Sequence, residues 1–235
     1  MATVTLINDP IFTIPPTASQ SVCVGGTIPA LTFNSSGGSG TASYQWYAVN
    51  GSTYTTILGA TNPSYTPPIF NVAGTYAYAV AISQTASGCA SGFSPLANVT
   101  VVADPNVSSP SAANYCQGGL PSNPLTVTAT AGINSGYAYQ LFSNGSNNNT
   151  SGIAISGATA AAYTPPTSAV GTLYYYCQVN QGAGCSVNST PASITVVPGP
   201  AFTSQPLPSQ TVCAGASLNA LSVAYSGGTG TPTYQ

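Results

Sequence analysis

The chain repeats itself with a period of 95 residues, and this feature constrains its fold more than any other. The pair Tyr44-Gln45 recurs as Tyr139-Gln140 and again as Tyr234-Gln235, 95 residues further on each time. A fixed period of this size predicts a linear array of similar domains, each of ordinary domain size.

The end of each repeat carries a β-branched run followed by a junction. The runs VTLI, VTVV and ITVV occupy residues 4–7, 99–102 and 194–197. They are followed by the dipeptides Asp9-Pro10, Asp104-Pro105 and Gly199-Pro200. Because Pro fixes φ, these junctions are expected to be short and stiff. We therefore expect the last strand of a preceding repeat at 1–9, two repeats at 10–104 and 105–199, and the first strands of a third at 200–235, as a piece of a longer array.

Short β-prone segments separated by Gly and Pro dominate both repeats, which is typical of an all-β sandwich. The strands predicted in the first repeat are 11–14, 21–24, 28–33, 43–49, 55–58, 74–83 and 97–102. Those predicted in the second are 125–130, 137–143, 171–180 and 192–197.

Charged side chains are almost absent. The chain has no Lys, Arg or His, and its acidic residues are Asp9 and Asp104. Nucleic-acid binding needs cations, and general acid–base catalysis near neutral pH needs His, Lys or paired carboxylates. One carboxylate per junction is too few for calcium. No apolar run is long enough to cross a membrane as a helix. The composition predicts no enzyme, no cofactor, no metal, no nucleic-acid partner and no membrane insertion.

Six cysteines in a β-rich chain indicate an oxidising, extracellular compartment. Cys23 and Cys89 lie near the start and end of the first repeat, and Cys116 and Cys185 lie similarly in the second. This layout predicts one bridge within each repeat, Cys23–Cys89 and Cys116–Cys185. Cys213 matches the opening cysteines and is expected to be unpaired.

Cys177 is the additional cysteine of the second repeat, and it aligns with Val80 when the Gly-Thr pairs at 74–75 and 171–172 are superposed. Two interpretations stay open. In one, Cys177 is a buried free thiol in a valine-sized position. In the other, it forms a bridge with Cys116 and leaves Cys185 free.

The pattern of aromatic residues is similar to that of a known fold. Trp46 lies in a Tyr-Gln-Trp-Tyr strand about thirty residues before the strand that carries Tyr78, and Tyr175 begins a Tyr-Tyr-Cys element in the second repeat. These features resemble the core Trp and the Tyr-x-Cys element of immunoglobulin-like domains. The resemblance implies antiparallel β-sandwiches with Trp46, Tyr78 and Tyr175 in their cores. The second repeat departs from the pattern by having Leu141 in place of the Trp.

A closer resemblance is to the tandem immunoglobulin-like or PKD-like repeats of large surface proteins in Bacteroidota. It is carried by Cys-x-Gly-Gly, Tyr-Gln-Trp-Tyr, Gly-Ala-Thr, Tyr-Thr-Pro-Pro, Gly-Thr, Gly-Cys and Val-Thr-Val elements. In the first repeat these lie at 23–26, 44–47, 59–61, 65–68, 74–75, 88–89 and 99–101. The resemblance implies a cell-surface adhesin of the gliding-motility type, exported by type IX secretion, with the secretion and motility machinery as partners.

Three functions follow as hypotheses. The leading one is a structural spacer or stalk, whose repeats contact their neighbours and project a binding region from the cell. The second is a module that binds glycans or abiotic surfaces through loops and exposed tyrosines, with Tyr137, Tyr139 and 174–176 as candidates. The third is a self-assembling extracellular structural protein, because a surface with so little net charge favours association.

Overall fold

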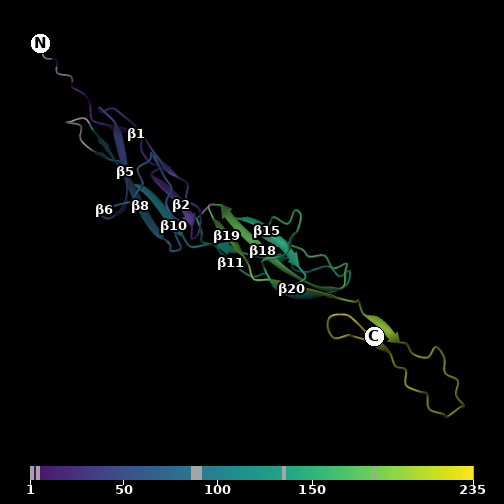
Figure 1. Cartoon of the computed structure of the whole chain (residues 1–235). Helices are drawn as coiled ribbons and strands as arrows, with labels where there is room; N and C mark the ends of the chain where they lie inside the picture. Colours follow the sequence, from purple (N-terminus) through teal and green to yellow (C-terminus); the bar gives the residue numbers. More distant parts are fainter. Residues whose placement is uncertain (1–2, 4–5, 86–91, 134–135, 183, 235) are drawn as a thin grey trace. The chain divides into compact units, whose positions relative to one another are not determined.

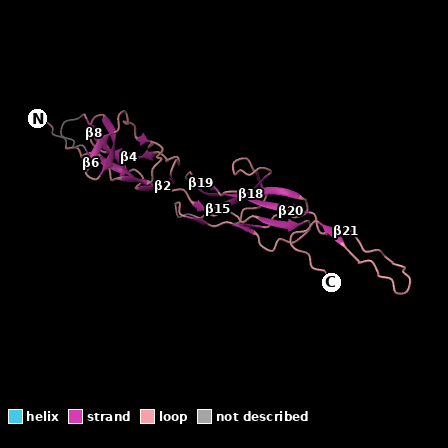
Figure 2. Cartoon of the chain, turned by 90° about the horizontal axis from the view of Figure 1, so that it is seen from below, coloured by secondary structure: helices cyan, strands magenta, loops and turns pink. Residues whose placement is uncertain are grey.

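The computed structural model describes residues 3, 6–85, 92–133, 136–182 and 184–234, and its ordered elements in these ranges are all strands (Figure 2). By compactness the chain divides into two units. The first compact unit holds 1–106, 130–137 and 180–186, and the second holds 107–129, 138–179 and 187–235. Two segments of the second sequence repeat, 130–137 and 180–186, therefore belong to the same compact unit as the first repeat.

The strands of the first repeat are β1 to β10, and the longer ones are labelled in Figure 1. Their bounds are β1 Ile11–Ile14, β2 Ser19–Cys23, β3 Leu31–Thr32, β4 Asn34–Ser36, β5 Ala42–Asn50, β6 Thr53–Thr56, β7 Ser64–Tyr65, β8 Gly74–Gln84, β9 Gly92–Phe93 and β10 Ala97–Val102. The predicted strands at 11–14 and 97–102 have these bounds. The strand predicted at 28–33 is instead reduced to β3, and a separate strand, β4, follows it.

The first repeat is a sandwich of two layers. One layer is a sheet in the order β2-β10-β8-β5-β6, with β9 paired to β8. The other layer contains the antiparallel pairs β1–β4 and β3–β7. Pro15-Pro16 separates β1 from β2, and proline cannot donate a ladder hydrogen bond. The chain therefore leaves the layer of the β1–β4 pair there and enters the six-stranded sheet, where β2 pairs parallel to β10. This parallel pair departs from the purely antiparallel sandwich that we expected.

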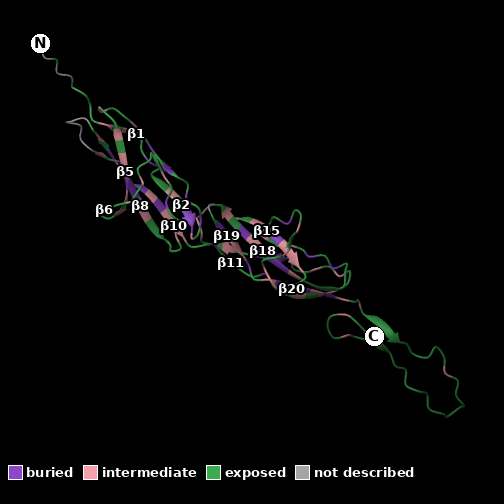
Figure 3. Ribbon diagram, viewed as in Figure 1, coloured by how far each residue is buried: buried purple, intermediate pink, exposed green. Residues whose placement is uncertain are grey.

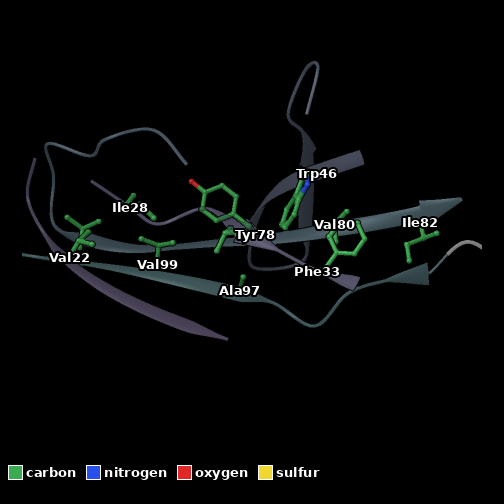
Figure 4. Close-up of a cluster of buried hydrophobic side chains, with 11 residues drawn as sticks. Val22, Ile28, Phe33, Trp46, Tyr78, Val80, Ile82, Ala97 and Val99 are labelled. Carbon is green, nitrogen blue, oxygen red and sulfur yellow. The ribbon is translucent and has the colours of Figure 1, made fainter. Parts of the chain in front are cut away.

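The core of the first repeat lies between these layers (Figure 4). β8 places Tyr78, Val80 and Ile82 on its buried face, as expected for alternate residues of a strand. Trp46 of β5 is the register partner of Val80 and is fully buried. From the opposite layer, Phe33 packs edge-on against Trp46, with ring centroids 5.8 Å apart. Aromatic pairs at this spacing add about 0.5–1.5 kcal/mol beyond their buried area.

The second repeat uses the same order, β12-β20-β18-β15-β16, with β19 paired to β18. Its strands are β11 Asn106–Val107, β12 Ala113–Cys116, β13 Leu125–Thr126, β14 Ala129–Thr130, β15 Ala138–Asn144, β16 Ile153–Ala154, β17 Ala162–Tyr163, β18 Gly171–Gly182, β19 Cys185–Asn188 and β20 Ala192–Val197. The β12–β20 pair is again parallel. The register also repeats, because Tyr175 pairs with Ala192 as Tyr78 pairs with Ala97.

After the second repeat, β21 Ala201–Ser204 pairs with β22 Ala224–Ser226. Nearly all residues from 200 to 234 are exposed (Figure 3). This pair repeats the β1–β4 pairing of the first repeat, including a register shift at the same place in the strand. The all-β fold class predicted from the sequence is confirmed.

Candidate functional site

One disulfide joins the two sequence repeats. Cys23, the last residue of β2, is bonded to Cys185, the first residue of β19, with a Cα–Cα distance of 4.9 Å and a sequence separation of 162 residues. Both residues are fully buried and belong to the first compact unit. A formed disulfide fits an oxidising environment.

This pairing corrects the predicted bridges. Cys185 is bonded to Cys23, so the predicted Cys116–Cys185 bridge is wrong, and Cys116 is a half-buried free thiol. The predicted Cys23–Cys89 bridge is also wrong because Cys23 is bonded to Cys185, while Cys89 lies outside the described residues. The physical reason is the position of Cys185 in the fold. Residues 180–186 pack in the first compact unit, where the end of β2 also lies.

Glycines let the two cysteine segments approach each other. After Cys23 the chain turns, with the Gly26 N–H donating to the Cys23 carbonyl at 2.9 Å and Gly25 at φ +76°. A Cβ atom on Gly184 would lie only 2.3 Å from the Gly26 Cα. Any side chain at Gly184 would therefore force the two backbones apart, and the Gly-Cys dipeptide is needed for this bond.

Cys177 occupies the buried position of Val80. Its backbone N–H donates to Ser189 Oγ at 3.0 Å, as the Val80 N–H donates to Ser94 Oγ at 3.1 Å. The Cys177 thiol is free and fully buried. Burial raises its pKa to about 11, partly offset by a backbone hydrogen bond from Gln140. Of the two interpretations, the structure has the buried free thiol, and the Cys116–Cys177 bridge is not formed. Cys213 is also free, and it is exposed.

The three aromatic residues expected in the cores are buried there. Trp46 also donates its indole N–H to the Asn62 carbonyl at 2.9 Å, which satisfies its one polar group. Burial raises the pKa of Tyr78 to about 12, and Tyr65 and Tyr76 add to the shift. Burial likewise raises the pKa of Tyr175. These side chains stabilise the sandwiches and are closed to ligands.

Two of the tyrosines proposed as a sugar platform are buried, whereas Tyr137, Tyr139 and Tyr174 are half-exposed. Tyr175 and Tyr176 are both buried, although they point to opposite faces of β18. The outer ring, Tyr176, stacks on Phe142 with centroids 5.0 Å apart, and its hydroxyl accepts a hydrogen bond from the Gly152 N–H at 3.1 Å. The segment that contains Gly152 therefore covers the face on which an exposed tyrosine was expected.

An aromatic patch that sequence reasoning missed lies on the first repeat. It consists of Tyr47 on β5, Tyr54 on β6 and Phe93 on β9. The rings of Tyr54 and Phe93 are 4.6 Å apart, and Tyr47 lies 5.3 Å from Phe93 and 6.3 Å from Tyr54. Tyr54 is 42% exposed and Phe93 51%. The signal was present, because Tyr47 follows the buried Trp46 and must face the other side of the sheet.

Metal sites and membrane-spanning helices are both absent from the described part of the chain. It contains no group of three Cys, Asp, Glu or His residues placed to hold a metal ion. Within the same ranges, no helix is both long and apolar enough to span a membrane.

Two repeats of the same two-layer strand order define this protein as a tandem array of immunoglobulin-like β-sandwich domains. The chain belongs to the family described as Domain of unknown function (DUF8696), whose model matches residues 14–103 and again residues 106–198. No curated protein matches the chain.

Solved structures of low sequence identity are similar. Three immunoglobulin domains of titin, in a variant with Glu-to-Ala changes, are 16% identical, with 88% of this chain and 72% of that chain covered and a TM-score of 0.45. Fibronectin(III)-like modules of Clostridium thermocellum CbhA are 16% identical, with 80% and 92% covered and a TM-score of 0.37. Drosophila N-cadherin EC1-3 is 14% identical, with 80% and 67% covered and a TM-score of 0.31.

Proposed function

We propose that this chain is a structural segment of a long extracellular surface adhesin or filament, in which the repeats form a spacer that projects a binding region from the cell. The observation that carries the proposal is the Cys23–Cys185 bond between consecutive repeats. Its partners are the neighbouring repeats of the same chain. The resemblance to Bacteroidota repeats extends the proposal to a gliding-motility adhesin handled by type IX secretion and motility machinery.

A covalent bond between repeats suits a spacer under tension. The bond closes a loop across 162 residues, so a force applied at the two ends of the chain bypasses the segment between the two cysteines. Without Lys, Arg or His, the chain has no side-chain ion pairs to hold neighbouring repeats together. The disulfide supplies that connection in a form that neither salt nor pH weakens near neutrality.

The composition supports a role without catalysis. No side-chain base is available to activate a Ser or Cys nucleophile. Burial raises the pKa of the Cys177 thiol, whereas nucleophilic cysteines need a lowered pKa.

Single-molecule pulling of the whole chain from its ends tests the spacer proposal. In oxidised protein the loop between Cys23 and Cys185 is locked, and unfolding releases little length. Reduction should release about 550 Å more, from 162 residues at about 3.4 Å each. It should also lower the force at which the first release occurs. A Cys213→Ser variant is the matched control, because Cys213 is exposed and unbonded. An oxidised chain that yields at the same force as the Cys23→Ser/Cys185→Ser variant would contradict mechanical reinforcement.

A second function is favoured by the aromatic patch of Tyr47, Tyr54 and Phe93. Clustered exposed rings present flat apolar faces that can pack on sugar rings or on an abiotic surface. The test measures binding of the whole chain to a glycan panel and adsorption to apolar and silica surfaces. Tyr54→Ala/Phe93→Ala should remove binding, whereas Tyr174→Ala, outside the patch, should keep it. Equal binding by both variants would exclude the aromatic patch as the binding site.

A further inference from the structure

The opening cysteine of each repeat sits in the same local turn. The N–H three residues later donates to the cysteine carbonyl in all three cases: Gly26 to Cys23 at 2.9 Å, Gly119 to Cys116 at 2.9 Å, and Ala216 to Cys213 at 3.0 Å. The glycine two residues after each cysteine has a positive φ. The turn that positions Cys23 for its disulfide is therefore already formed at Cys116.

The environments of Cys23 and Cys116 differ in one respect. Two segments of the following repeat, 130–137 and 180–186, share a compact unit with Cys23, and the second of them carries Cys185. For Cys116, the chain holds an equivalent of the 130–137 segment but none of the 180–186 segment. Its Sγ lies 3.5 Å from the Thr229 Oγ1, in a glycine-rich loop that stands 95 residues after the 131–137 loop. Residues 200–235 contain no Gly-Cys dipeptide.

The exposure of the three opening cysteines rises as fewer of these segments are present. Cys23, which shares a compact unit with both segments, is fully buried. Cys116, with one segment, is half-buried, and Cys213 is exposed. A cavity of about 410 Å³ opens beside Cys116, and its walls include Pro200, Phe202, Tyr225, Thr229 and Tyr234. The cavity thus lies between the opening cysteine Cys116 and the glycine-rich loop that contains Thr229.

We propose that this cavity is the docking site for the Gly-Cys hairpin of a following repeat, and that Cys116 forms a disulfide with the cysteine of that hairpin. The occupant has the chemistry of the segment 180–186: a turn whose glycine permits backbone contact and whose cysteine points at the opening cysteine. The Cys23–Cys185 bond is the formed example in the same chain. Each repeat in such an array is then bonded to the next one, rather than closed within itself.

The bond forms by two exchange steps with a disulfide oxidant such as oxidised glutathione. The Cys116 thiolate attacks the oxidant and releases one glutathione, giving a mixed disulfide. The hairpin thiolate then displaces the second glutathione. Two thiols lose two protons and two electrons, and one oxidised glutathione becomes two reduced molecules.

An extended chain tests the proposal directly. Gln140 and Gln235 hold equivalent positions, so appending a copy of residues 141–199 after Gln235 completes the third repeat and leaves the whole natural chain in place. After oxidation in a glutathione buffer and alkylation, chymotryptic mapping should show Cys116 bonded to the copied Cys185. The matched control carries Cys185→Ser in the copy only. In that control Cys116 should become alkylated while Cys23–Cys185 stays intact.

Two outcomes would overturn the proposal. One is an alkylated Cys116 in the oxidised extended chain. The other is a bond between Cys213 and the copied Cys185, which would place the bridge within one repeat. If the added repeat fails to fold, the natural chain is equilibrated in glutathione buffer with a peptide of residues 178–188. Preference of the peptide for Cys116 over the exposed Cys213 supports the docking site, and equal or reversed occupancy refutes it.

The inference rests on the proposed array, but it can fail separately. If Cys116 is bonded in the extended chain but reduction does not change the unfolding force, the bridge proposal is supported and the spacer proposal is refuted. If reduction lowers the unfolding force but Cys116 is alkylated in the extended chain, the spacer proposal is supported and the bridge proposal is refuted.

Discussion

The Cα atoms of Cys23 and Cys185 lie 4.9 Å apart, although 162 residues separate them in the sequence. The first cysteine ends an outer strand of one repeat, and the second begins a short strand of the next. Both cysteines belong to the first compact unit, which takes residues from both repeats, and the spacer proposal and the proposed Cys116 bridge follow from this bond.

Removing this disulfide should lower the free energy of unfolding. The chain-entropy argument gives about 5 kcal/mol for a loop of 162 residues, and measured effects are commonly about 2–5 kcal/mol. Urea denaturation of Cys23→Ser/Cys185→Ser, compared with Cys213→Ser, measures the loss. Identical midpoints for the two variants would mean that the bond does not contribute to stability.

Truncating Trp46 should destabilise the first repeat by about 3–5 kcal/mol, because the change leaves a large cavity and an unpaired Asn62 carbonyl. Denaturation followed by circular dichroism compares Trp46→Ala with Tyr54→Ala, whose side chain is exposed. A Trp46→Ala loss no larger than that of Tyr54→Ala would contradict the central position of Trp46.

The free thiols should react in the order of their exposure. Cys213 is expected to be alkylated first and Cys116 next, while Cys177 should remain unmodified until the chain unfolds. The Cys177 pKa of about 11 leaves almost no thiolate near neutral pH, which adds to the protection by burial. Timed maleimide labelling with peptide mapping checks this order. Rapid labelling of Cys177 in urea-free buffer would show that its site opens.

Ser94 and Ser189 accept hydrogen bonds from the N–H groups of Val80 and Cys177, and they should contribute equally to stability. Each hydroxyl accepts from the buried N–H of a central strand and also donates to the next carbonyl, at Pro95 or Thr190. Ser94→Ala and Ser189→Ala should each cost about 1–3 kcal/mol, since a buried N–H loses its acceptor. Cys177→Val, which copies the first repeat, should change stability by less than about 1.5 kcal/mol. A larger loss for Cys177→Val than for Ser189→Ala would contradict the alignment.

Alkaline pH should unfold the first repeat through its buried tyrosine. Tyr78 has a folded pKa of about 12, above the value near 10 of an unfolded tyrosine. Its contribution to stability is therefore complete below pH 10 and is lost as the pH rises towards 12. Tyrosinate absorbance and circular dichroism should change together in this window. The Tyr78→Phe variant should unfold at higher pH than the natural chain, and an unchanged midpoint would place the sensitive group elsewhere.

Much of the fold could be predicted because it depends on local patterns. Alternation of apolar residues predicted β8, β10 and β20, and Gly and Pro marked where these strands end. The alignment of Cys177 with Val80 needed only the shared Gly-Thr pair before each strand. The shortening of the 28–33 strand to β3 and the separate strand β4 after it were missed, because their partners, β7 and β1, come from distant parts of the chain.

The sequence by itself determined the repeat period, the all-β class, the buried positions of Trp46, Tyr78 and Tyr175, and a composition without Lys, Arg or His. Only the tertiary structure decided which cysteines meet and which aromatic rings stay exposed. A disulfide partner is chosen by distance in space, and sequence spacing does not distinguish a cysteine of the same repeat from its counterpart in the next. Tyr176 and the patch of Tyr47, Tyr54 and Phe93 all lie on outer faces, and whether a loop covers such a face depends on long-range packing.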